Sequence, residues 1–333
     1  MRHLADEIIK GRRLGRDDDL TVFLHADLEE LKKGADAIRR ALCGDRADLC
    51  SIVNGRSGRC SENCKFCAQS GHHHTDCETY GFLSQQELLD DCGQMQSQGV
   101  DRFSIVTSGR TMEGEDLERS IAAYAAMHRQ YPDMILCASH GLMSVKDMCR
   151  LKEAGVTVYH TNVETSPRFF PEICTTHTFS DKLIQISRVK EAGLVVCSGG
   201  IFGMGESWED RLDMAILLAE LEVGSIPLNF LIPIKGTPLA DRPRLTREEI
   251  VRIVATFRYC NPEAYIRIAA GRIYFENGAQ VLFQSGANAV LTGDMLTTTG
   301  SGTAQDREML TGLGFTLKPD SSANGNRRRY YES

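Results

Sequence analysis

Short apolar runs rich in β-branched residues recur along the chain, and several follow a longer amphipathic stretch that ends at a glycine. This junction occurs four times, at Gln98-Gly99-Val100, Ala154-Gly155-Val156, Ala192-Gly193-Leu194 and Ser285-Gly286-Ala287. Glycine commonly ends a helix because it adopts the left-handed conformation without a Cβ clash. A short apolar run directly after such a glycine is typical of a buried strand. The pattern therefore predicts amphipathic helices that lead directly into strands.

Eight strands are predicted in this way, and amphipathic helices separate them. They cover residues 49–54, 101–107, 134–138, 156–161, 194–199, 226–231, 264–268 and 288–291. Strands that alternate with helices at this spacing form a parallel sheet with right-handed crossovers. Eight such units favour an α/β fold closed into a (β/α)8 barrel of the TIM type. An open, doubly wound sheet is the alternative.

The two ends of the chain lack this alternation. Residues 1–44 form a charged N-terminal helical extension, and residues 45–315 contain the predicted barrel. From 316 to 333 the sequence forms a C-terminal tail with the run Asn326-Arg327-Arg328-Arg329. A polar chain end of this kind is typical of solvated chain, so we expect the tail to be mobile and without a catalytic role.

Composition and charge narrow the class of protein. Of the 333 residues, 42% are hydrophobic, which is enough for a large core. The net charge of -7 argues against a nucleic-acid partner, which requires a clustered basic surface. The start of the chain lacks an apolar signal, and the longest apolar stretch, 226–234, is shorter than the roughly 20 residues of a membrane span. We therefore expect a cytoplasmic protein without a membrane partner, whose twelve cysteines are reduced.

Three cysteines, Cys60, Cys64 and Cys67, follow the first predicted strand with the spacing Cys-x3-Cys-x2-Cys. Iron–sulfur cubes are normally held by four cysteines, and structural zinc by four Cys or His ligands. Gly55 and Gly58 allow the loop to fold tightly around a bound group. The motif therefore predicts an iron–sulfur cluster with one iron open to a further ligand.

Further polar residues and cysteines lie toward the carboxyl ends of the predicted strands, where barrels of this kind carry their catalytic groups. They are Cys137, Asn162, Glu164, Cys197, Asn229 and Arg267. We expect all of them to face one cavity. If Arg267 is buried, its permanent charge requires an anionic partner, which a cluster, a carboxylate or a cofactor would supply. Structural roles stay open: a buried thiol for Cys197, a helix-terminal charge for Glu164, and turns for the two asparagines.

Five separated segments resemble the biotin synthase family of radical S-adenosylmethionine (SAM) enzymes, and the resemblance extends from about residue 45 to 315. The loop 58–70 resembles the cluster loop of the family. Residues 196–206, Val-Cys-Ser-Gly-Gly-Ile-Phe-Gly-Met-Gly-Glu, resemble its fifth-strand signature, which is highly specific. The remaining matches are 159–166, 227–229 together with 235–239, and 265–272.

The resemblance implies a sulfurtransferase that converts dethiobiotin to biotin. Cys60, Cys64 and Cys67 would hold a 4Fe-4S cluster that binds SAM, and reductive cleavage of SAM would give the 5'-deoxyadenosyl radical that takes hydrogen from dethiobiotin. In the family an auxiliary 2Fe-2S cluster donates the sulfur. The resemblance also implies an electron donor such as flavodoxin or ferredoxin, and a homodimer.

Residue roles follow from the matched segments. The residues that would contact SAM or its cluster are Phe66, Asn162, Glu164, His177, Gly199, Gly203 and Glu206. Asn162 and Asn229 would also bind the ureido ring of dethiobiotin, because an amide matches its N–H and C=O groups. Thr298, after the eighth predicted strand, is a further candidate for binding the substrate, with the approach to the next helix as the alternative.

One position departs from the family pattern. The usual auxiliary ligands are three cysteines and one arginine. Cys137, Cys197 and Arg267 match three of them, and Arg267 also counts as a catalytic residue. Ser104 occupies the place of the missing cysteine, and a hydroxyl is a harder, weaker ligand for cluster iron than a thiolate. We predict that Cys174, in the loop after the fourth strand, replaces it, which would allow a four-iron cluster with an open iron. An ordinary loop cysteine is the alternative.

Two other classes of function stay open. Radical SAM mutases and hydrogenase-maturation enzymes use the same barrel, but the combination of Cys137, Cys197 and Arg267 favours sulfur insertion. A non-catalytic iron–sulfur or zinc protein is the other class, and the glycine-rich fifth-strand segment argues against it.

Overall fold

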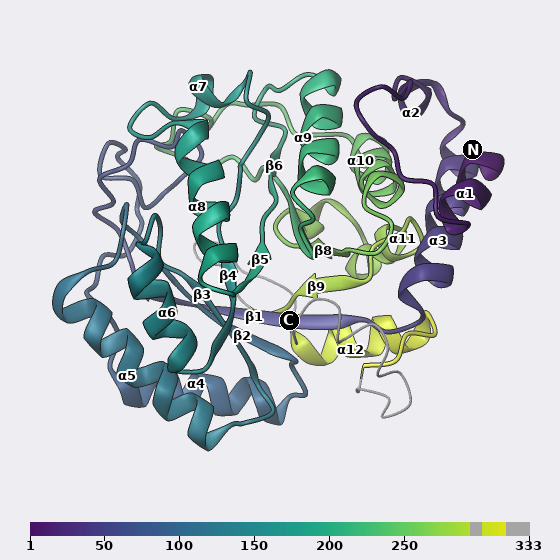
Figure 1. Ribbon diagram of the computed structural model, residues 1–333. Coiled ribbons are helices and arrows are strands. Elements are labelled where there is room, and N and C mark those ends of the chain that lie inside the picture. The colour runs from purple at the N-terminus through teal and green to yellow at the C-terminus, as the bar shows by residue number, and fades with distance from the viewer. Residues whose placement is uncertain (294–301, 318–333) are drawn as a thin grey trace.

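Parallel strands form a closed barrel in the computed structural model, which describes residues 1–293 and 302–317 (Figure 1). The strands are β1 (Asp48–Arg56), β2 (Arg102–Thr107), β3 (Ile135–Ser139), β4 (Val156–His160), β5 (Val195–Cys197), β6 (Gly200–Phe202), β7 (Ser225–Phe230), β8 (Tyr265–Ile268) and β9 (Ala289–Leu291). They pair in the order β5-β4-β3-β2-β1-β9-β8-β7-β6, and β5 also pairs with β7 at Cys197 and Ser225. This last pairing closes the sheet, so the predicted barrel is confirmed and the open-sheet alternative is wrong.

All eight predicted strands are present, but the fifth is split into two. β5 ends at Cys197 and β6 begins at Gly200, and both lie against β7. At the interruption, the Gly199 N–H donates to the side-chain oxygen of Asn162 (3.0 Å). This hydrogen bond connects the segment between β5 and β6 to the loop after β4, where several of the predicted site residues lie.

Helices cover the outside of the barrel (Figure 1). They are α4 (Gln85–Ser97), α5 (Gly114–Gln130), α6 (Val145–Glu153), α7 (Phe170–Ile173), α8 (Phe179–Glu191), α9 (Trp208–Glu220), α10 (Arg247–Cys260), α11 (Gln280–Phe283) and α12 (Thr303–Gly312), with 3-10 turns at Arg272–Tyr274 and Asn277–Ala279. α4 begins with a capping box of Ser84 and Glu87, and α8, α9 and α10 begin in the same way. Gly99, Gly155 and Gly193 have φ values of 73°, 104° and 68°, so the predicted helix-ending glycines adopt the left-handed conformation.

The N-terminal helices pack on the side of the barrel that α10 covers (Figure 1). They are α1 (Arg2–Ile9), α2 (Val22–His25) and α3 (Leu28–Cys43). The close approach of α3 to α10 depends on Gly34, where an added Cβ would lie 1.8 Å from the Tyr259 hydroxyl oxygen. Arg16 ties the segment between α1 and α2 to α9 through Asp213 (2.5 Å) and Glu220 (2.8 Å). The extension therefore covers the outer surface of two barrel helices.

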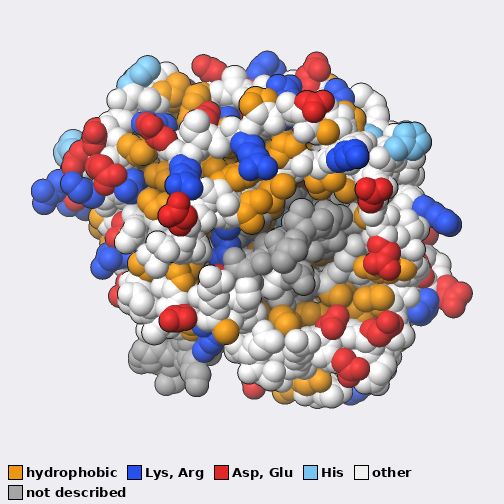
Figure 2. All heavy atoms as spheres, turned by 180° about the vertical axis from the view of Figure 1, so that it is seen from behind, with side chains coloured by type: hydrophobic (Ala, Val, Ile, Leu, Met, Phe, Trp, Pro, Cys, Tyr) orange, Lys and Arg blue, Asp and Glu red, His pale blue; other side chains and the backbone are white. Residues whose placement is uncertain are grey.

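The surface carries charges of both signs. On the face drawn in Figure 2, acidic and basic side chains are interspersed among apolar ones. The described part of this face therefore lacks the single-sign basic patch that binds nucleic acid. Across residues 1–293 and 302–317, each helix is too short or too polar to cross a bilayer.

Two predictions concern residues outside the described part of the chain. Thr298 lies between 294 and 301, and most of the expected tail lies at 318–333. Both stay predictions.

Candidate active site

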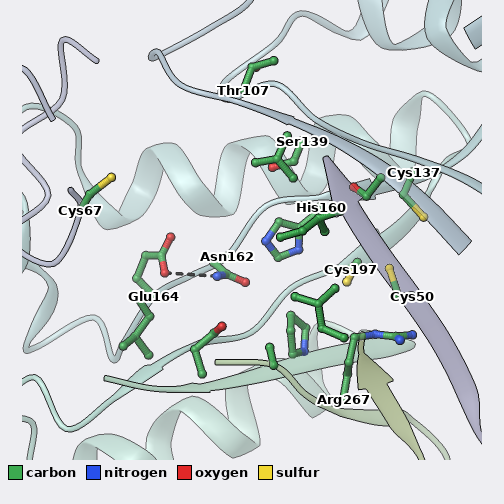
Figure 3. Close-up of a pocket in the computed structure, with 18 of the residues that line it drawn as sticks. Cys50, Cys67, Thr107, Cys137, Ser139, His160, Asn162, Glu164, Cys197 and Arg267 are labelled. Atoms are coloured by element: carbon green, nitrogen blue, oxygen red, sulfur yellow. Dashed lines mark hydrogen bonds between the residues drawn. The ribbon is translucent and has the colours of Figure 1, made fainter. Parts of the chain in front are cut away.

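A cavity of about 370 Å³ opens at the carboxyl ends of the strands and extends down between them (Figure 3). Most of the predicted site residues line it, namely Cys60, Cys64, Phe66, Cys67, Cys137, Asn162, Glu164, Cys197, Asn229 and Arg267. Five other predicted residues that the structure describes are not among the lining residues, and these are Cys174, His177, Gly199, Gly203 and Glu206. The side chains that were predicted to lie at the carboxyl ends of the strands thus do line one cavity.

Cys60, Cys64 and Cys67 lie on one loop at the mouth of this cavity. The loop is closed on itself, because the Cys60 N–H donates to the Gln69 carbonyl (3.0 Å) and the Cys67 N–H to the Cys64 carbonyl (3.0 Å). Gly58 begins the loop with a φ of 75°, and an added Cβ there would lie 2.4 Å from the Thr79 hydroxyl. A tight, glycine-dependent loop therefore presents three thiols to one cavity.

The donor set of this loop fits an iron–sulfur cluster with an open iron. Burial raises the pKa of Cys67 to about 11. The contact with Cys174, and then burial, raises the pKa of Cys64. Iron takes the thiolate form, so binding displaces both protons. Three sulfurs leave one iron of a cube without a protein ligand.

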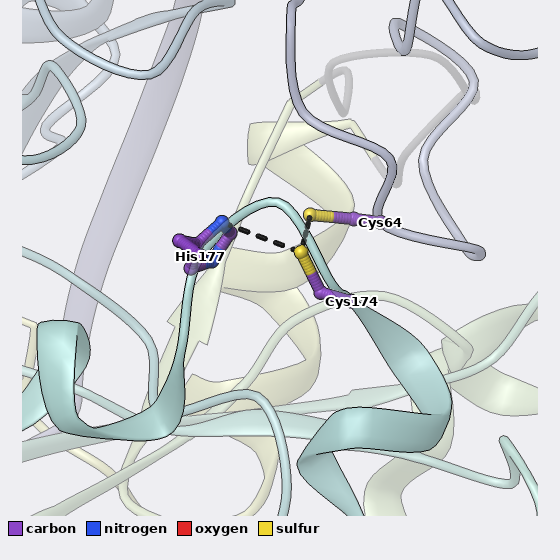
Figure 4. A group of neighbouring side chains, drawn as sticks. All are labelled: Cys64, Cys174 and His177. Atoms are coloured by element: carbon purple, nitrogen blue, oxygen red, sulfur yellow. Dashed lines mark hydrogen bonds between the residues drawn. The ribbon is translucent and has the colours of Figure 1, made fainter.

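Cys174 lies in a different place from the one predicted. Its Sγ is 3.7 Å from the Cys64 Sγ and 3.3 Å from the His177 Nδ1 (Figure 4). It therefore contacts the first cysteine set instead of Cys137 and Cys197, and the prediction that it completes the second set is corrected.

Hydrogen bonds between residues 173–177 and the cluster loop explain this placement. The Asn63 Oδ1 accepts from the Thr175 N–H (2.9 Å), and the Lys65 N–H donates to the Ile173 carbonyl (2.9 Å). Because α7 directs the chain back onto the cluster loop, the segment after it is held at the mouth of the cavity, and Cys174 is held with it.

His177 is buried between Glu62 and Cys174. Its Nδ1 contacts the Glu62 carboxylate and the Cys174 thiol, and its Nε2 has no hydrogen-bond partner among the described residues. Burial lowers the pKa of His177, but these contacts outweigh it, so the pKa is raised. The Nε2 is therefore the ring nitrogen that is free to make the predicted contact of His177 with SAM or its cluster, which stays a prediction.

A second group of cysteines lies deeper in the cavity, on three different strands (Figure 3). Cys137 of β3 shares a hydrogen bond with Cys50 of β1, and this contact, followed by burial, raises the pKa of Cys137. Cys197 of β5 lines the same cavity, and burial raises its pKa as well. Ser104 is the register partner of Cys137 on β2. The third thiol of this group is therefore Cys50.

Two arginines and one aspartate form a buried charged group next to these cysteines. The Arg102 Nε donates to both Asp48 oxygens (2.7 and 2.8 Å), and the Arg267 Nη2 donates to Oδ1 (2.5 Å). Two guanidinium groups and one carboxylate leave a net charge of +1. Both arginines lower the pKa of Cys197, which opposes the effect of burial. The anionic partner of Arg267 is thus Asp48, and its predicted role as an iron ligand stays a prediction.

Glu164 has an unusual backbone conformation, with a φ of 68°. Residues with a Cβ rarely adopt it, and it is enriched at functional sites. The Glu164 N–H donates to the Gly199 carbonyl (3.2 Å), and the Ile201 N–H donates back to the Glu164 carbonyl (2.9 Å). Its side chain enters the cavity, where the Asn162 Nδ2 donates to it (3.3 Å) (Figure 3). Glu164 lies outside the helices, so the helix-terminal alternative is wrong.

The fifth-strand glycines permit close packing within the protein. An added Cβ at Gly199 would lie 1.9 Å from the Pro227 carbonyl oxygen, and one at Gly200 would lie 2.2 Å from the Glu164 carbonyl oxygen. Gly199 is also one of the residues predicted to contact SAM or its cluster, and that contact stays a prediction.

Glu206 closes the turn after β6. Its carboxylate accepts from the N–H groups of Gly203 and Met204 (2.8 Å each) and from the Arg211 Nε (2.8 Å). Since these partners are all internal, Glu206 and Gly203 shape the loop behind the cavity. The cofactor contacts predicted for them stay predictions.

Asn162 and Asn229 line the cavity and keep hydrogen-bonding capacity. The Asn162 Oδ1 accepts from Gly199, and the Asn229 Nδ2 donates to the Gly200 carbonyl (3.1 Å) while its Oδ1 accepts from Ala270 (3.3 Å). An amide offers two donors and two lone pairs, so each side chain can also bind a ligand. The predicted role with a ureido ring stays a prediction.

Comparison with known proteins assigns the chain to a family. Residues 56–218 match the radical SAM superfamily, and residues 227–316 match the biotin and thiamin synthesis associated domain. The chain is 56% identical to a biotin synthase of Clostridium beijerinckii, over 95% of this chain and 100% of that protein. It is 55% identical to a biotin synthase of Alkaliphilus metalliredigens, over 95% and 99%. The chain belongs to the biotin synthase family.

Family membership establishes the reaction. The chain is a radical SAM sulfurtransferase that acts on dethiobiotin and SAM, with a 4Fe-4S cluster and an auxiliary iron–sulfur cluster. Two separate groups of thiols in one cavity fit these two cofactors. The mutase, hydrogenase-maturation and non-catalytic alternatives are therefore set aside.

Two solved structures agree with the fold of this chain. The chain superposes on methylornithine synthase with a TM-score of 0.82 at 19% identity, over 96% of this chain and 98% of that one. It superposes on the FeFe-hydrogenase maturase of Carboxydothermus hydrogenoformans with a TM-score of 0.75 at 19% identity, over 94% and 79%. At this identity the likeness concerns the fold alone.

Sequence reasoning missed several cavity residues of this biotin synthase family member, among them Cys50, Arg102 and His160. Cys50 and Ile52 line the cavity two positions apart on β1, as the side-chain period of a strand requires. His160 is the last residue of β4 and lines the cavity, and burial lowers its pKa. The strand period was the signal that would have found Cys50.

Proposed function

We propose that Cys60, Cys64 and Cys67 hold the SAM-binding cluster, and that Cys50, Cys137 and Cys197 hold the auxiliary cluster. The observation that carries this proposal is the grouping of Cys50 with the two matched cysteines on the alternate strands β1, β3 and β5. Three thiolates suit a four-iron auxiliary cluster with one open iron. When bound, the clusters and SAM supply the radical and the sulfur.

The side chains around the cavity bind and orient SAM and dethiobiotin, and they exclude water. The Glu164 carboxylate accepts from the ribose hydroxyls of SAM, and Asn162 fixes that carboxylate by its hydrogen bond (3.3 Å). Asn162 and Asn229 bind the ureido ring of dethiobiotin. Phe66 supplies apolar surface beside the cluster loop, which keeps water from a reactive radical.

The net positive group of Arg102, Asp48 and Arg267 stabilises the second thiol set as thiolates. A buried positive charge favours the charged form of a neighbouring thiol, and thiolate is the form that binds iron. Arg267 therefore acts through charge, with Asp48 as its bonded partner.

An anaerobic assay tests the reaction and the site together. Protein reconstituted with iron and sulfide receives reductant, SAM and dethiobiotin, and we expect biotin and 5'-deoxyadenosine by mass spectrometry. Formation of 5'-deoxyadenosine without biotin would contradict sulfur insertion. Omitting dethiobiotin is the control for uncoupled SAM cleavage.

Three further properties belong to the same proposal. We infer a homodimer and an electron donor of the flavodoxin or ferredoxin kind from the family resemblance. A cytoplasmic location suits twelve cysteines that serve as metal ligands and free thiols, because oxidising compartments pair such thiols. Sedimentation tests the homodimer, and reduction of the cluster by flavodoxin or by ferredoxin tests the electron donor.

A further inference from the structure

Three metal-binding side chains meet beside the mouth of the cavity, and they come from two segments of the chain (Figure 4). Cys64 lies on the cluster loop, whereas Cys174 and His177 lie on the segment after α7. One donor atom from each side chain lies within 4.8 Å of the donor atoms of the other two. Thiolate and imidazole are ligands that suit zinc in proteins. This group therefore has the chemistry of a zinc site.

The distances between the donor atoms match those around a tetrahedral zinc ion. The Sγ atoms of Cys64 and Cys174 are 3.7 Å apart, and the Cys174 Sγ is 3.3 Å from the His177 Nδ1. With Zn–S bonds of about 2.3 Å and Zn–N bonds of about 2.05 Å, tetrahedral angles place two sulfurs about 3.8 Å apart and a sulfur about 3.6 Å from a nitrogen. Both pairs are thus within a few tenths of an ångström of the spacing that one ion requires.

Hydrogen bonds of neighbouring residues hold these donors in place. The Asn63 Oδ1 accepts from the Thr175 N–H (2.9 Å), so the residues next to Cys64 and Cys174 are bonded to each other. Cys174 is 4% exposed, and the His177 side chain is 5% exposed. Side chains that are already fixed lose little conformational freedom when they bind an ion. The donor group is therefore preorganised.

A metal ion would replace hydrogen bonds of the His177 Nδ1, which contacts the Cys174 Sγ (3.3 Å) and the Glu62 carboxylate. Binding of zinc displaces the protons of the two thiols, and any proton on Nδ1, to solvent. Two thiolates then neutralise the double charge of the ion, and the Glu62 carboxylate beside it adds attraction. Three protein donors leave the fourth tetrahedral position for water.

We propose that Cys64, Cys174 and His177 bind a single zinc ion in the protein that has not yet received its SAM-binding cluster. Zinc and the cluster exclude each other, because both require the Cys64 sulfur. Divalent zinc also ranks above ferrous iron in affinity for such donors, so the site favours zinc. The exclusion rests on the proposed assignment of the cluster to Cys60, Cys64 and Cys67, whereas the zinc site rests on the donor geometry alone.

The test uses the full-length chain, purified without oxygen, iron or sulfide, with Cys60→Ala, Cys67→Ala and Cys137→Ala to break up the other two thiol groups. Cobalt(II) is the probe, because tetrahedral cobalt absorbs strongly in the visible range and its bonds to thiolate add a charge-transfer band in the near ultraviolet. We expect a tetrahedral spectrum with two thiolates, which added zinc abolishes. A second chain with serine at these three positions keeps the side-chain volume and repeats every reading, and circular dichroism checks that each chain is folded.

Two further changes in this triple variant separate the two kinds of donor. Cys174→Ala should halve the charge-transfer intensity, whereas His177→Gln should keep it, because both thiolates remain. Each should weaken zinc binding about tenfold or more, since loss of an outer partner of a metal ligand already has an effect of this size. His73→Gln is the matched control and should keep the affinity, because His73 contacts the Cys64 carbonyl (3.1 Å) but lies outside the donor group. Competition with a chelator measures each affinity.

Native protein tests the exclusion. After reconstitution with iron and sulfide, zinc treatment and gel filtration, we expect it to retain no more zinc than Cys174→Ala treated in the same way.

Two results overturn the zinc site. One is the absence of a two-thiolate cobalt spectrum in both folded triple variants, and the other is unchanged zinc affinity after Cys174→Ala and His177→Gln. Zinc that fully reconstituted native protein retains, but Cys174→Ala does not, would instead contradict the assignment of Cys64 to the cluster. That result would overturn the proposed function and leave the zinc site standing.

Discussion

Single residues of this site take their roles from the partners that the barrel gives them. Arg267 pairs with Asp48, and Glu206 is bonded to its own turn and to Arg211. Cys50 contacts Cys137 from two strands away, although nothing in its local sequence marks it as a ligand. At this scale, the chemistry of a side chain follows from which groups it contacts inside the closed barrel.

Cys50→Ala tests the second thiol set. We expect the variant to lose the iron and sulfide of one cluster and to form no biotin, because two of three thiolates remain. SAM cleavage at the cluster loop should persist. Iron and sulfide analysis after anaerobic reconstitution measures the first effect, and 5'-deoxyadenosine measures the second.

Cys174→Ala is the matched control for that experiment, since the structure places Cys174 against Cys64. It should keep the auxiliary iron. If Cys174→Ala loses the auxiliary cluster and Cys50→Ala keeps it, the assignment of Cys50 is wrong.

Glu164→Gln tests the nucleoside contact. The amide keeps the shape of the side chain and removes the charge, so each hydrogen bond to a ribose hydroxyl loses its ionic part. Hydrogen bonds to charged groups contribute about 1.5–3 kcal/mol, so we expect SAM affinity to fall about 10- to 100-fold. Calorimetric titration of the reconstituted protein measures it. Glu172→Gln, at an exposed position of α7, should bind SAM normally.

At the level of helices and strands, the interrupted fifth strand packs against both β7 and the segment after β4. Gly199 and Gly200 lie against the backbone of Pro227 on β7 and of Glu164 after β4. The same contacts hold Glu164 in its left-handed conformation. The glycine motif therefore determines how the strands meet, and through that contact it orients the carboxylate.

Gly200→Ala tests this packing. The added Cβ would lie 2.2 Å from the Glu164 carbonyl oxygen, so backbone must move. We expect a loss of about 3 kcal/mol in the free energy of unfolding and a weaker affinity for SAM. Denaturant unfolding measures the loss in the free energy of unfolding.

Gly312→Ala is the control, because nothing lies within 4 Å of an added Cβ there. It ends α12 and should stabilise the protein by about 0.5–1 kcal/mol, as alanine does in place of glycine in a helix. Equal stabilities of Gly200→Ala and the native protein would contradict the packing argument.

At the scale of the whole molecule, buried polar groups tie the helices to the barrel. His140, after β3, is fully buried, and its ring nitrogens contact the hydroxyls of Thr107 (3.1 Å) and Ser120 (3.1 Å). Burial lowers the pKa of His140 to about 3 from its usual 6.5. Folding therefore requires neutral imidazole at this junction of β2, β3 and α5.

Stability should depend on pH through His140. Between pH 6.5 and 3 the unfolded chain binds a proton there that the folded chain does not, so this group lowers stability as pH falls. The slope is about 1.4 kcal/mol per pH unit. Asp101, whose pKa burial raises to about 6, acts in the opposite direction between its unfolded pKa and that value.

His140→Gln should remove the His140 contribution. Between pH 6 and 5, we expect the stability of the variant to fall less steeply than that of the native protein by about 1.4 kcal/mol per unit. Urea unfolding under anaerobic conditions measures the slopes. His3→Gln, at an exposed histidine, should keep the native slope, and an unchanged slope in His140→Gln would refute the assignment.

The strand positions, the helix ends and the cluster loop could be predicted from the sequence, because these depend on period, capping residues and spacing within a few residues. Glycines such as Gly155 end helices wherever they occur, and Cys60, Cys64 and Cys67 share one loop. The closed barrel places Cys50, and not Cys174, in contact with Cys137. Barrel closure and strand register bring distant segments together, and no local pattern encodes which side chains then meet.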